Sequence, residues 1–170
     1  MNISDYLIEQ SGKDWADLLS EWRDLLPESF TVWLVNRFGD VFLVTEDGSV
    51  HVLDVGVGAL ERVADSRDHF ADQIGMDDNA ANWLLIPLVD DCVAAGLIPS
   101  ENQCYSYKVP PVLGGEYALE NIEPADLSVH YCVLASLLRQ TKDLDDGTRI
   151  QEVVLESPPE SAPGSSSTPR

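Results

Sequence analysis

The chain has 170 residues, 44% of them hydrophobic, so it is long enough to bury a sizeable core, and we expect a single folded domain. Its 30 Asp and Glu residues against 10 Lys and Arg give a formal net charge of −20. This charge disfavours direct binding to nucleic acids and to anionic membranes, because both are bound largely through Lys and Arg.

Two interpretations of the acidity remain open: it serves solubility, or it attracts a basic protein partner. No apolar run reaches the roughly 18 to 20 residues of a membrane span, and residues 1–15 lack the pattern of a signal peptide. We therefore expect a cytoplasmic protein in a bacterial-type cell. Cys92, Cys104 and Cys132 are far apart and form no CxxC motif, which predicts buried, reduced thiols.

Residues 14–26, DWADLLSEWRDLL, place apolar side chains on one stripe of an amphipathic helix. Asp14 is suited to cap this helix and Pro27 to end it. Trp15 and Trp22 share the stripe, and we expect both rings in the core. Residues 1–26 are thus predicted to be an N-terminal helical segment that precedes the main domain.

The next stretch is ambiguous. Residues 31–35 are rich in β-forming side chains, yet the apolar residues at positions 30, 33 and 34 also fit a helical turn. Ser29 as a cap and Gly39 as a stop favour the helix, and we predict a short helix here.

The stretch from Phe38 to Val55 predicts a β-hairpin. Two β-branched, apolar runs flank Asp47-Gly48, the strongest short-range signal for such a turn. The first arm, residues 41–44, is apolar on both faces, so we expect it to be covered on both sides. This hairpin is therefore predicted to be the centre of the fold.

The residues after the hairpin predict a turn and two helical segments. Residues 56–58, GVG, lack the remainder of any phosphate-binding motif and indicate a turn. Residues 66–74 are expected to form a helix. Asp77-Asp78-Asn79 is expected to cap a second helix that Pro87 should kink or split and that Gly96 should end.

A second hairpin is predicted from residues 104–122. Residues 104–109 alternate as a strand does, and Pro110-Pro111 ends that strand. Gly114-Gly115 supplies the turn, and residues 116–122 are expected to return as the partner strand. The connection PPVLGG is a rigid apolar loop, which indicates a buried plug or a contact site.

A long helix is predicted over residues 124–144, followed by a marginal strand over 148–155. Residues 157–170 are rich in Pro and Ser, which predicts a disordered tail. We therefore expect an α+β fold: one domain over residues 27–156, with a small, mostly antiparallel sheet built from two hairpins and packed by several helices.

The sequence offers no arrangement typical of an enzyme. Ser49 and Ser106 lie outside any GxSxG motif, and His51, His69 and His130 are not spaced as metal ligands. His130 and Cys132, two positions apart on a helix, diverge by about 200°. We expect no catalytic residues, no metal and no cofactor.

Several segments, taken in order, resemble a known family. They are Trp33 to Val44, then CYSYK from Cys104, PVLGGEY from Pro111, ENI from Glu120 and DLSVH from Asp126. This order resembles the Tdi-type immunity domain, the C-terminal domain of proteins that protect bacteria from type VI-secreted DNase effectors, in the SUKH-like group of α+β immunity folds. The similarity runs from about Pro27 to Thr148. The pattern is a structural signature, so it implies no active site.

The resemblance implies a protein that binds a cognate toxin with a basic surface, expected to be a nuclease, and occludes its active site. An interface of this kind needs carboxylates together with apolar anchors. From expected exposure, the candidate partner-binding residues are Asp77, Asp78, Trp83, Asp90, Asp91, Glu116, Tyr117 and Glu120. The alternative is a general acidic interaction module without a toxin partner.

Overall fold

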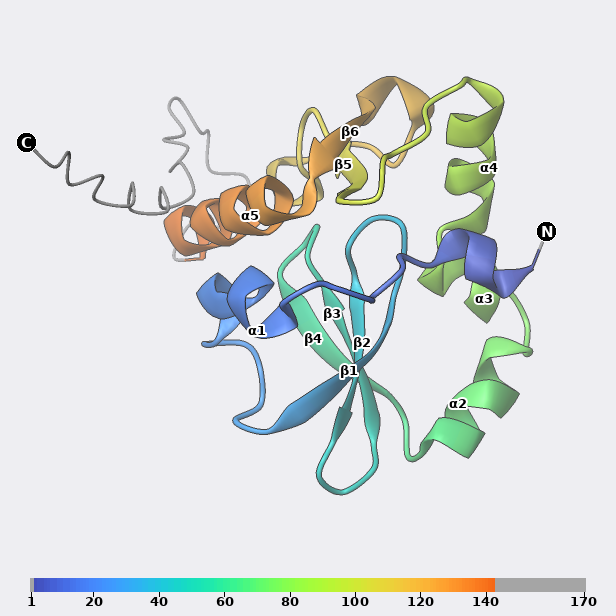
Figure 1. Ribbon diagram of the computed structural model, residues 1–170, viewed down its shortest axis with the longest axis vertical. Coiled ribbons are helices and arrows are strands. Elements are labelled where there is room, and N and C mark those ends of the chain that lie inside the picture. Colours follow the sequence, from blue (N-terminus) through green and yellow to red (C-terminus); the bar gives the residue numbers. More distant parts are fainter. Residues whose placement is uncertain (1, 143–170) are drawn as a thin grey trace, which may run out of the picture.

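A four-stranded antiparallel sheet with helices on both faces organises residues 2–142, the part of the chain that the structure, a computed structural model, describes (Figure 1). A separate two-stranded antiparallel ribbon contacts the last helix. The α+β, single-domain class predicted from the sequence is confirmed. The α-helices are α1 (Trp15–Leu18), α2 (Arg67–Ile74), α3 (Asn79–Trp83), α4 (Ile86–Ala94) and α5 (Leu127–Thr141).

The sheet is a meander in which chain order and spatial order coincide. Its strands are β1 (Phe30–Val35), β2 (Val41–Thr45), β3 (Val50–Asp54) and β4 (Ala59–Ala64). β2 and β3 form the predicted hairpin, with Val44 opposite Val50. Gly48 has φ +86°, the left-handed conformation that the Asp-Gly signal predicts.

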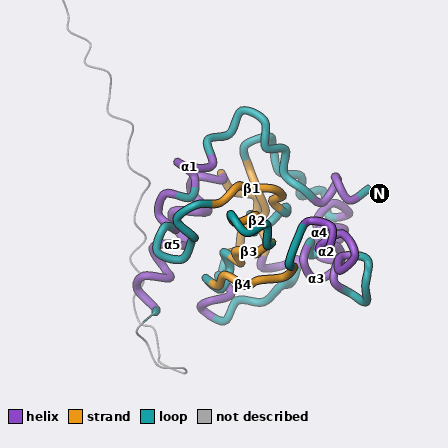
Figure 2. The backbone as a smooth tube through the Cα atoms, turned by 90° about the horizontal axis from the view of Figure 1, so that it is seen from below, coloured by secondary structure: helices purple, strands orange, loops and turns teal. Residues whose placement is uncertain are grey.

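Strand β2 lies between two hydrophobic clusters, as its apolar sequence predicts. Phe42 packs in one cluster with Phe70 of α2, whereas Val41 and Leu43 pack in the other with Tyr131 of α5. Figure 2 shows α2, α3 and α4 on one side of the sheet and α1 and α5 on the other. Burying each such side chain contributes about 1.5–3 kcal/mol to the free energy of folding. Because β2 has side chains in both clusters, the hairpin stabilises the hydrophobic core on each side of the sheet.

The short helix predicted between Ser29 and Gly39 is wrong, because residues 30–35 form β1. Its β-branched residues pair with β2 from Phe30, opposite Thr45, to Val35, opposite Val41. A bulge between Val32 and Leu34 shifts the register. The bulge breaks the alternation of side chains, and this produced the helix-like spacing in the sequence.

The continuous helix predicted over residues 14–26 is also wrong. Asp14 caps α1 as predicted, its side chain accepting the Asp17 amide at 3.1 Å, but α1 ends at Leu18 and a 3₁₀ turn, Ser20–Trp22, follows. The turn lets Trp22 reach α5, where its indole N–H donates to the Tyr131 carbonyl at 3.1 Å. Packing against α5 therefore overrides the helical pattern.

The helices between the two sheets follow the sequence closely. Ser66 caps α2 by accepting the His69 amide at 3.0 Å. The predicted break at Pro87 is confirmed: Leu85, with φ +52°, separates α3 from α4, and Pro87 lies in the first turn of α4. The strand β4, which the sequence analysis did not predict, links the GVG turn to α2.

The ribbon consists of β5 (Gln103–Tyr107) and β6 (Ile122–Asp126). β5 is the predicted strand, but the return strand predicted over residues 116–122 is wrong, since β6 begins at Ile122. Residues 108–121 instead form a loop containing two 3₁₀ turns, Pro111–Leu113 and Leu119–Asn121. α5 starts at Leu127 rather than near 124, because the preceding residues pair with β5.

Two further expectations fall on the end of the chain. The strand predicted over 148–155 and the tail predicted over 157–170 lie outside the described residues. The division of the chain at residues 26 and 156 stays a prediction. None of the helices between residues 2 and 142 is both long enough and apolar enough to cross a bilayer.

Candidate partner-binding surface

One side chain closes the loop of residues 108–121. Asn121 accepts the Val109 amide through Oδ1 at 2.9 Å, and its Nδ2 donates to the carbonyls of Val109 at 2.8 Å and Glu116 at 2.9 Å. The Asn121 carbonyl also accepts the Lys108 amide at 2.8 Å. The loop is therefore ordered by its own hydrogen bonds, which lowers the entropy that a partner must remove on binding.

The two glycines of the loop are required by its geometry. Gly114 has φ +86°, the left-handed region that favours glycine. Gly115 passes so close to the chain opposite that an added Cβ would overlap the carbonyl of Val109. The Gly-Gly pair that the sequence analysis took for a hairpin turn thus folds the loop back onto its own base.

Tyr117 is the exposed aromatic residue of this loop. Its side chain is 46% exposed, and its ring meets the buried ring of Tyr107 edge-on, with 5.7 Å between centroids. The β3–β4 turn lies alongside the loop, since the Val112 amide donates to the Gly56 carbonyl at 3.1 Å. Val57 in that turn is 42% exposed.

Asp54 shapes the same turn. Its Oδ1 accepts the amides of Gly56 and Val57 at 3.0 and 3.2 Å. Burial, followed by the charge of Asp54, raises the pKa of Tyr117 to about 12, so this carboxylate acts on the phenol. We call Asp54, Val57, Glu116 and Tyr117 the Tyr117 surface.

A second carboxyl group is buried next to Asp54. Asp40 accepts the Val55 amide at 3.0 Å and the side-chain amide of Asn36 at 2.9 Å. Burial, together with the charge of Asp54, raises the pKa of Asp40 to about 7. Burial also raises the pKa of Asp54. The negative charge of Asp40 therefore varies around neutral pH.

The structure brings together Ser106 and His130, which the sequence analysis had treated separately. The His130 Nε2–H donates to the Phe38 carbonyl, and the Ser106 hydroxyl donates to Nδ1, both at 2.8 Å. Burial lowers the pKa of His130 to about 4, so the ring is neutral. Both ring nitrogens are occupied inside the protein, and the pair connects β5, α5 and the β1–β2 turn.

A similar grouping of residue types lies at the tip of the first hairpin. The Ser49 hydroxyl donates to Asp47 at 2.6 Å and lies 3.0 Å from His51 Nε2. Hydrogen bonds from Ser49 and Thr45 hold the pKa of Asp47 below its usual range. Because the hydroxyl donates to the carboxylate rather than to the imidazole, the group stabilises the turn.

The cysteines and carboxylates of the described residues show no built metal site. Among residues 2–142, no group of three or more His, Cys, Asp or Glu is placed to hold a metal ion. The cysteines are buried, as predicted. Burial raises the pKa of the Cys92 and Cys104 thiols, which makes both poor nucleophiles.

The predicted partner-binding residues fall into two groups. Glu116, Tyr117 and Glu120 lie on the 108–121 loop and are exposed. The other group lies on α3, on α4 and in the turn before them: Asp77, Asp78, Trp83, Asp90 and Asp91. The two groups come near one another where α4 contacts the 3₁₀ turn Leu119–Asn121.

Two members of the helical group take part in the fold. Trp83 stacks on Phe70, with 5.1 Å between centroids and 15° between planes. Asp90 accepts the hydroxyl of Tyr6 at 2.8 Å. Asp77, Asp78 and Asp91 are exposed. Partner binding by either group stays a prediction.

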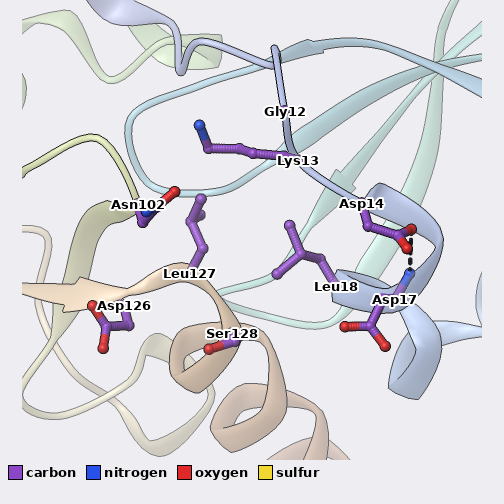
Figure 3. A pocket seen from close by; sticks show the side chains of 9 residues that line it. All are labelled: Gly12, Lys13, Asp14, Asp17, Leu18, Asn102, Asp126, Leu127 and Ser128. Atoms are coloured by element: carbon purple, nitrogen blue, oxygen red, sulfur yellow. Dashed lines mark hydrogen bonds between the residues drawn. The ribbon is translucent and has the colours of Figure 1, made fainter.

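An acidic hollow that sequence reasoning missed lies between the N-terminal segment and the start of α5 (Figure 3). It has a volume of about 450 Å³. Leu18 and Leu127 lie between the carboxylates of Asp14, Asp17 and Asp126. Its walls come from segments more than 80 residues apart, so no local pattern in the sequence indicates it.

Part of the chain is similar to a known protein family. Residues 64–138 match a family described as the C-terminal part of the T6SS immunity protein Tdi1. The matched span runs from the end of β4 into α5, so it contains the 108–121 loop, the Ser106–His130 pair and all the predicted partner-binding residues. No curated protein matches the chain. The resemblance expected from the sequence is confirmed for this span.

Proposed function

We propose that this chain, which matches the T6SS immunity family over residues 64–138, binds a cognate secreted toxin and neutralises it. The family match carries the proposal. The 108–121 loop supports it, because an ordered, exposed loop with an aromatic side chain suits recognition of a protein partner.

We propose further that the toxin is a nuclease and that neutralisation works by covering its basic active site. A nuclease must bind phosphates, so its active site carries positive charge. The net charge of −20 would steer this chain onto such a site and oppose the approach of nucleic acid. Occlusion requires no catalytic residue in the inhibitor.

The cytoplasm is the location we propose for the complex. A toxin that cleaves DNA meets its substrate there in a bacterial cell, and an inhibitor that covers the active site must be present in the same compartment. The cysteines, buried with raised thiol pKa at Cys92 and Cys104, suit a reducing compartment.

Co-expression with the protein encoded by the neighbouring gene tests the proposal. We expect the two chains to co-elute as a complex, and cells that make both to survive a toxin that kills cells lacking this chain. A catalytically inactive toxin and an unrelated lethal toxin serve as controls for toxicity and specificity. If the purified pair stays separate at low salt and the toxin remains lethal, the chain is instead a general acidic interaction module.

A further inference from the structure

We infer that the Tyr117 surface is the docking site for the basic partner, with the ring of Tyr117 receiving a Lys or Arg side chain and Asp54 and Glu116 facing its charge. The inference rests on the proposed function in one respect, since it takes the partner to be the toxin. It goes further by assigning the contact to one surface, and it includes Asp54 at the end of β3 and Val57 in the β3–β4 turn, both outside the matched span.

Tyr117 has the properties of an interface anchor. Tyrosine is enriched among the residues that contribute most to binding, because it presents a large, rigid ring with a polar end. This ring is 46% exposed, and it is supported from behind by Tyr107, which is 6% exposed. The ring therefore offers a face to a partner without first having to be ordered.

The backbone beneath the ring is equally constrained. Asn121 bonds to the Glu116 carbonyl, immediately before Tyr117, and to both polar groups of the Val109 backbone. The Val112 amide holds the loop against the β3–β4 turn. The 108–121 loop and the β3–β4 turn are therefore held against one another by a tertiary hydrogen bond.

The charge and polarity of the surface indicate what it binds. A cation attracted to a tyrosine ring gains further when a carboxylate lies within reach of the same position. Asp54 Oδ1 and the Tyr107 hydroxyl both lie 3.4 Å from where a Cβ at Gly56 would stand, and the Tyr107 ring contacts Tyr117, so this carboxylate lies close to the aromatic pair. Glu116 is the exposed neighbour of Tyr117 in the chain. Val57 adds an apolar contact for the methylene groups of a long basic side chain.

The other group of predicted partner-binding residues, on α3 and α4, is less suited to hold a partner. Its aromatic residue, Trp83, is stacked on Phe70, and the Asp90 carboxylate is bonded to Tyr6. The exposed apolar residue Ile98 follows α4, and the exposed carboxylate Asp72 lies on α2. These two residues supply control positions, whereas Asp91, an exposed carboxylate of α4, reports on the alternative surface.

Calorimetric titration of the neighbouring-gene protein, made catalytically inactive, with variants of this chain tests the inference. Tyr117→Ala should raise Kd by about tenfold or more, and Tyr117→Phe, which keeps the ring, should stay within about twofold of wild type. Asp54→Asn keeps an acceptor for the turn and should raise Kd about threefold, with a weaker dependence on salt. Ile98→Ala and Asp72→Asn should leave Kd unchanged within about twofold, and Asp91→Asn tests the alternative surface on α3 and α4.

The controls separate the possible failures. Circular dichroism and thermal unfolding must show each variant to be folded at the temperature of titration. If Tyr117→Ala unfolds, Tyr117→Leu, which removes the aromatic ring but keeps an apolar side chain, takes its place and should also weaken binding. If wild type binds and Tyr117→Ala binds equally well, or if Asp91→Asn causes the larger loss, the docking site is wrong and the proposed function stands. If wild type does not bind, the proposed function fails and the inference fails with it.

Discussion

Position 115 decides the shape of the 108–121 loop, because a Cβ there would overlap the Val109 carbonyl. We expect Gly115→Ala to destabilise the protein by about 2 kcal/mol and to weaken toxin binding, since the loop must open. Gly75→Ala is the matched control: its Cβ would lie 3.7 Å from the nearest atom, the Asp72 carbonyl oxygen, so we expect a change within about 0.5 kcal/mol. Urea unfolding measures both, and equal effects would contradict the role of the close approach.

Removing the hydrogen bond between Ser106 and His130 tests whether these two residues of the family pattern stabilise the fold or contribute directly to toxin binding. Ser106→Ala leaves the buried Nδ1 of His130 without its donor, which we expect to lower the free energy of unfolding by about 1–3 kcal/mol. Ser128→Ala, at an exposed position of α5, should change it by less than about 0.5 kcal/mol. Below the unfolding transition, Ser106→Ala should bind toxin normally. Lost binding with unchanged stability would show a direct functional role for the hydroxyl.

Asp40 makes stability depend on pH. Its pKa of about 7 in the folded state exceeds the value of about 3.9 in an unfolded chain, so its contribution is fully present below about pH 4 and is lost as pH rises through 7. His130 acts in the opposite sense: its pKa of about 4 lies below the unfolded value of about 6.5, so its contribution is lost as pH falls toward 4. Because these two groups change stability in opposite directions, the contribution of Asp40 is measured by comparing wild type with a variant that alters only the surroundings of Asp40.

Asp54→Asn provides that comparison, because it removes the charge beside Asp40 and keeps an oxygen for the amides of Gly56 and Val57. We expect the variant to be more stable than wild type at pH 8, by about 1 kcal/mol, and the difference to shrink toward pH 5 as Asp40 becomes protonated. Urea unfolding at pH 5, 6, 7 and 8 measures it. A difference that is constant across this range would show that the two carboxyl groups do not interact.

At the scale of elements, the sequence predicted correctly the turns and helix caps that depend on neighbouring residues. The β2–β3 hairpin and the cap of α1 follow from Asp-Gly and from Asp14, which act on their immediate neighbours. β1 was mistaken for a helix because its pairing with β2 and its bulge depend on a different strand. The sequence predicted a hairpin with the connection PPVLGG where the structure has the longer 108–121 loop, because Asn121 closes this loop across 12 residues.

In the candidate site, too, local properties could be predicted from the sequence, whereas tertiary contacts could not. Exposure patterns identified Glu116, Tyr117 and Glu120 from the sequence, and all three are exposed in the structure. The same patterns did not show that Trp83 would stack on Phe70. Nor did any pattern indicate that Val57 would lie beside a loop more than 50 residues further along the chain, because tertiary packing alone joins them.

The N-terminal segment gives a prediction at this scale, through its two tryptophans. The indole N–H of Trp22 donates to the Tyr131 carbonyl, whereas that of Trp15, also buried, has no acceptor within the part of the chain that the structure describes. We expect Trp22→Phe to cost about 1–2 kcal/mol more than Trp15→Phe, since only the former breaks a buried hydrogen bond. Thermal unfolding of the two variants measures the difference. Equal destabilisation would show that the hydrogen bond to α5 contributes nothing.

At the scale of the whole molecule, the net charge and the fold contribute differently to the proposed function: the charge favours encounter with the partner, and the fold determines where it binds. The two hydrophobic clusters around β2 support a rigid scaffold, and the 108–121 loop projects from the ribbon beside it. The net charge of −20 acts over the whole surface and favours encounter with a basic partner. The Tyr117 surface would then determine where that partner stays bound.

Displacement of nucleic acid from the toxin tests the central claim most directly. Labelled DNA bound to a catalytically inactive toxin should show high fluorescence anisotropy, and titration with this chain should release the DNA at one equivalent, because both compete for the basic site. The Tyr117→Ala variant should require about tenfold more protein for the same release. If this chain binds the toxin while the DNA stays bound, occlusion of the active site is wrong.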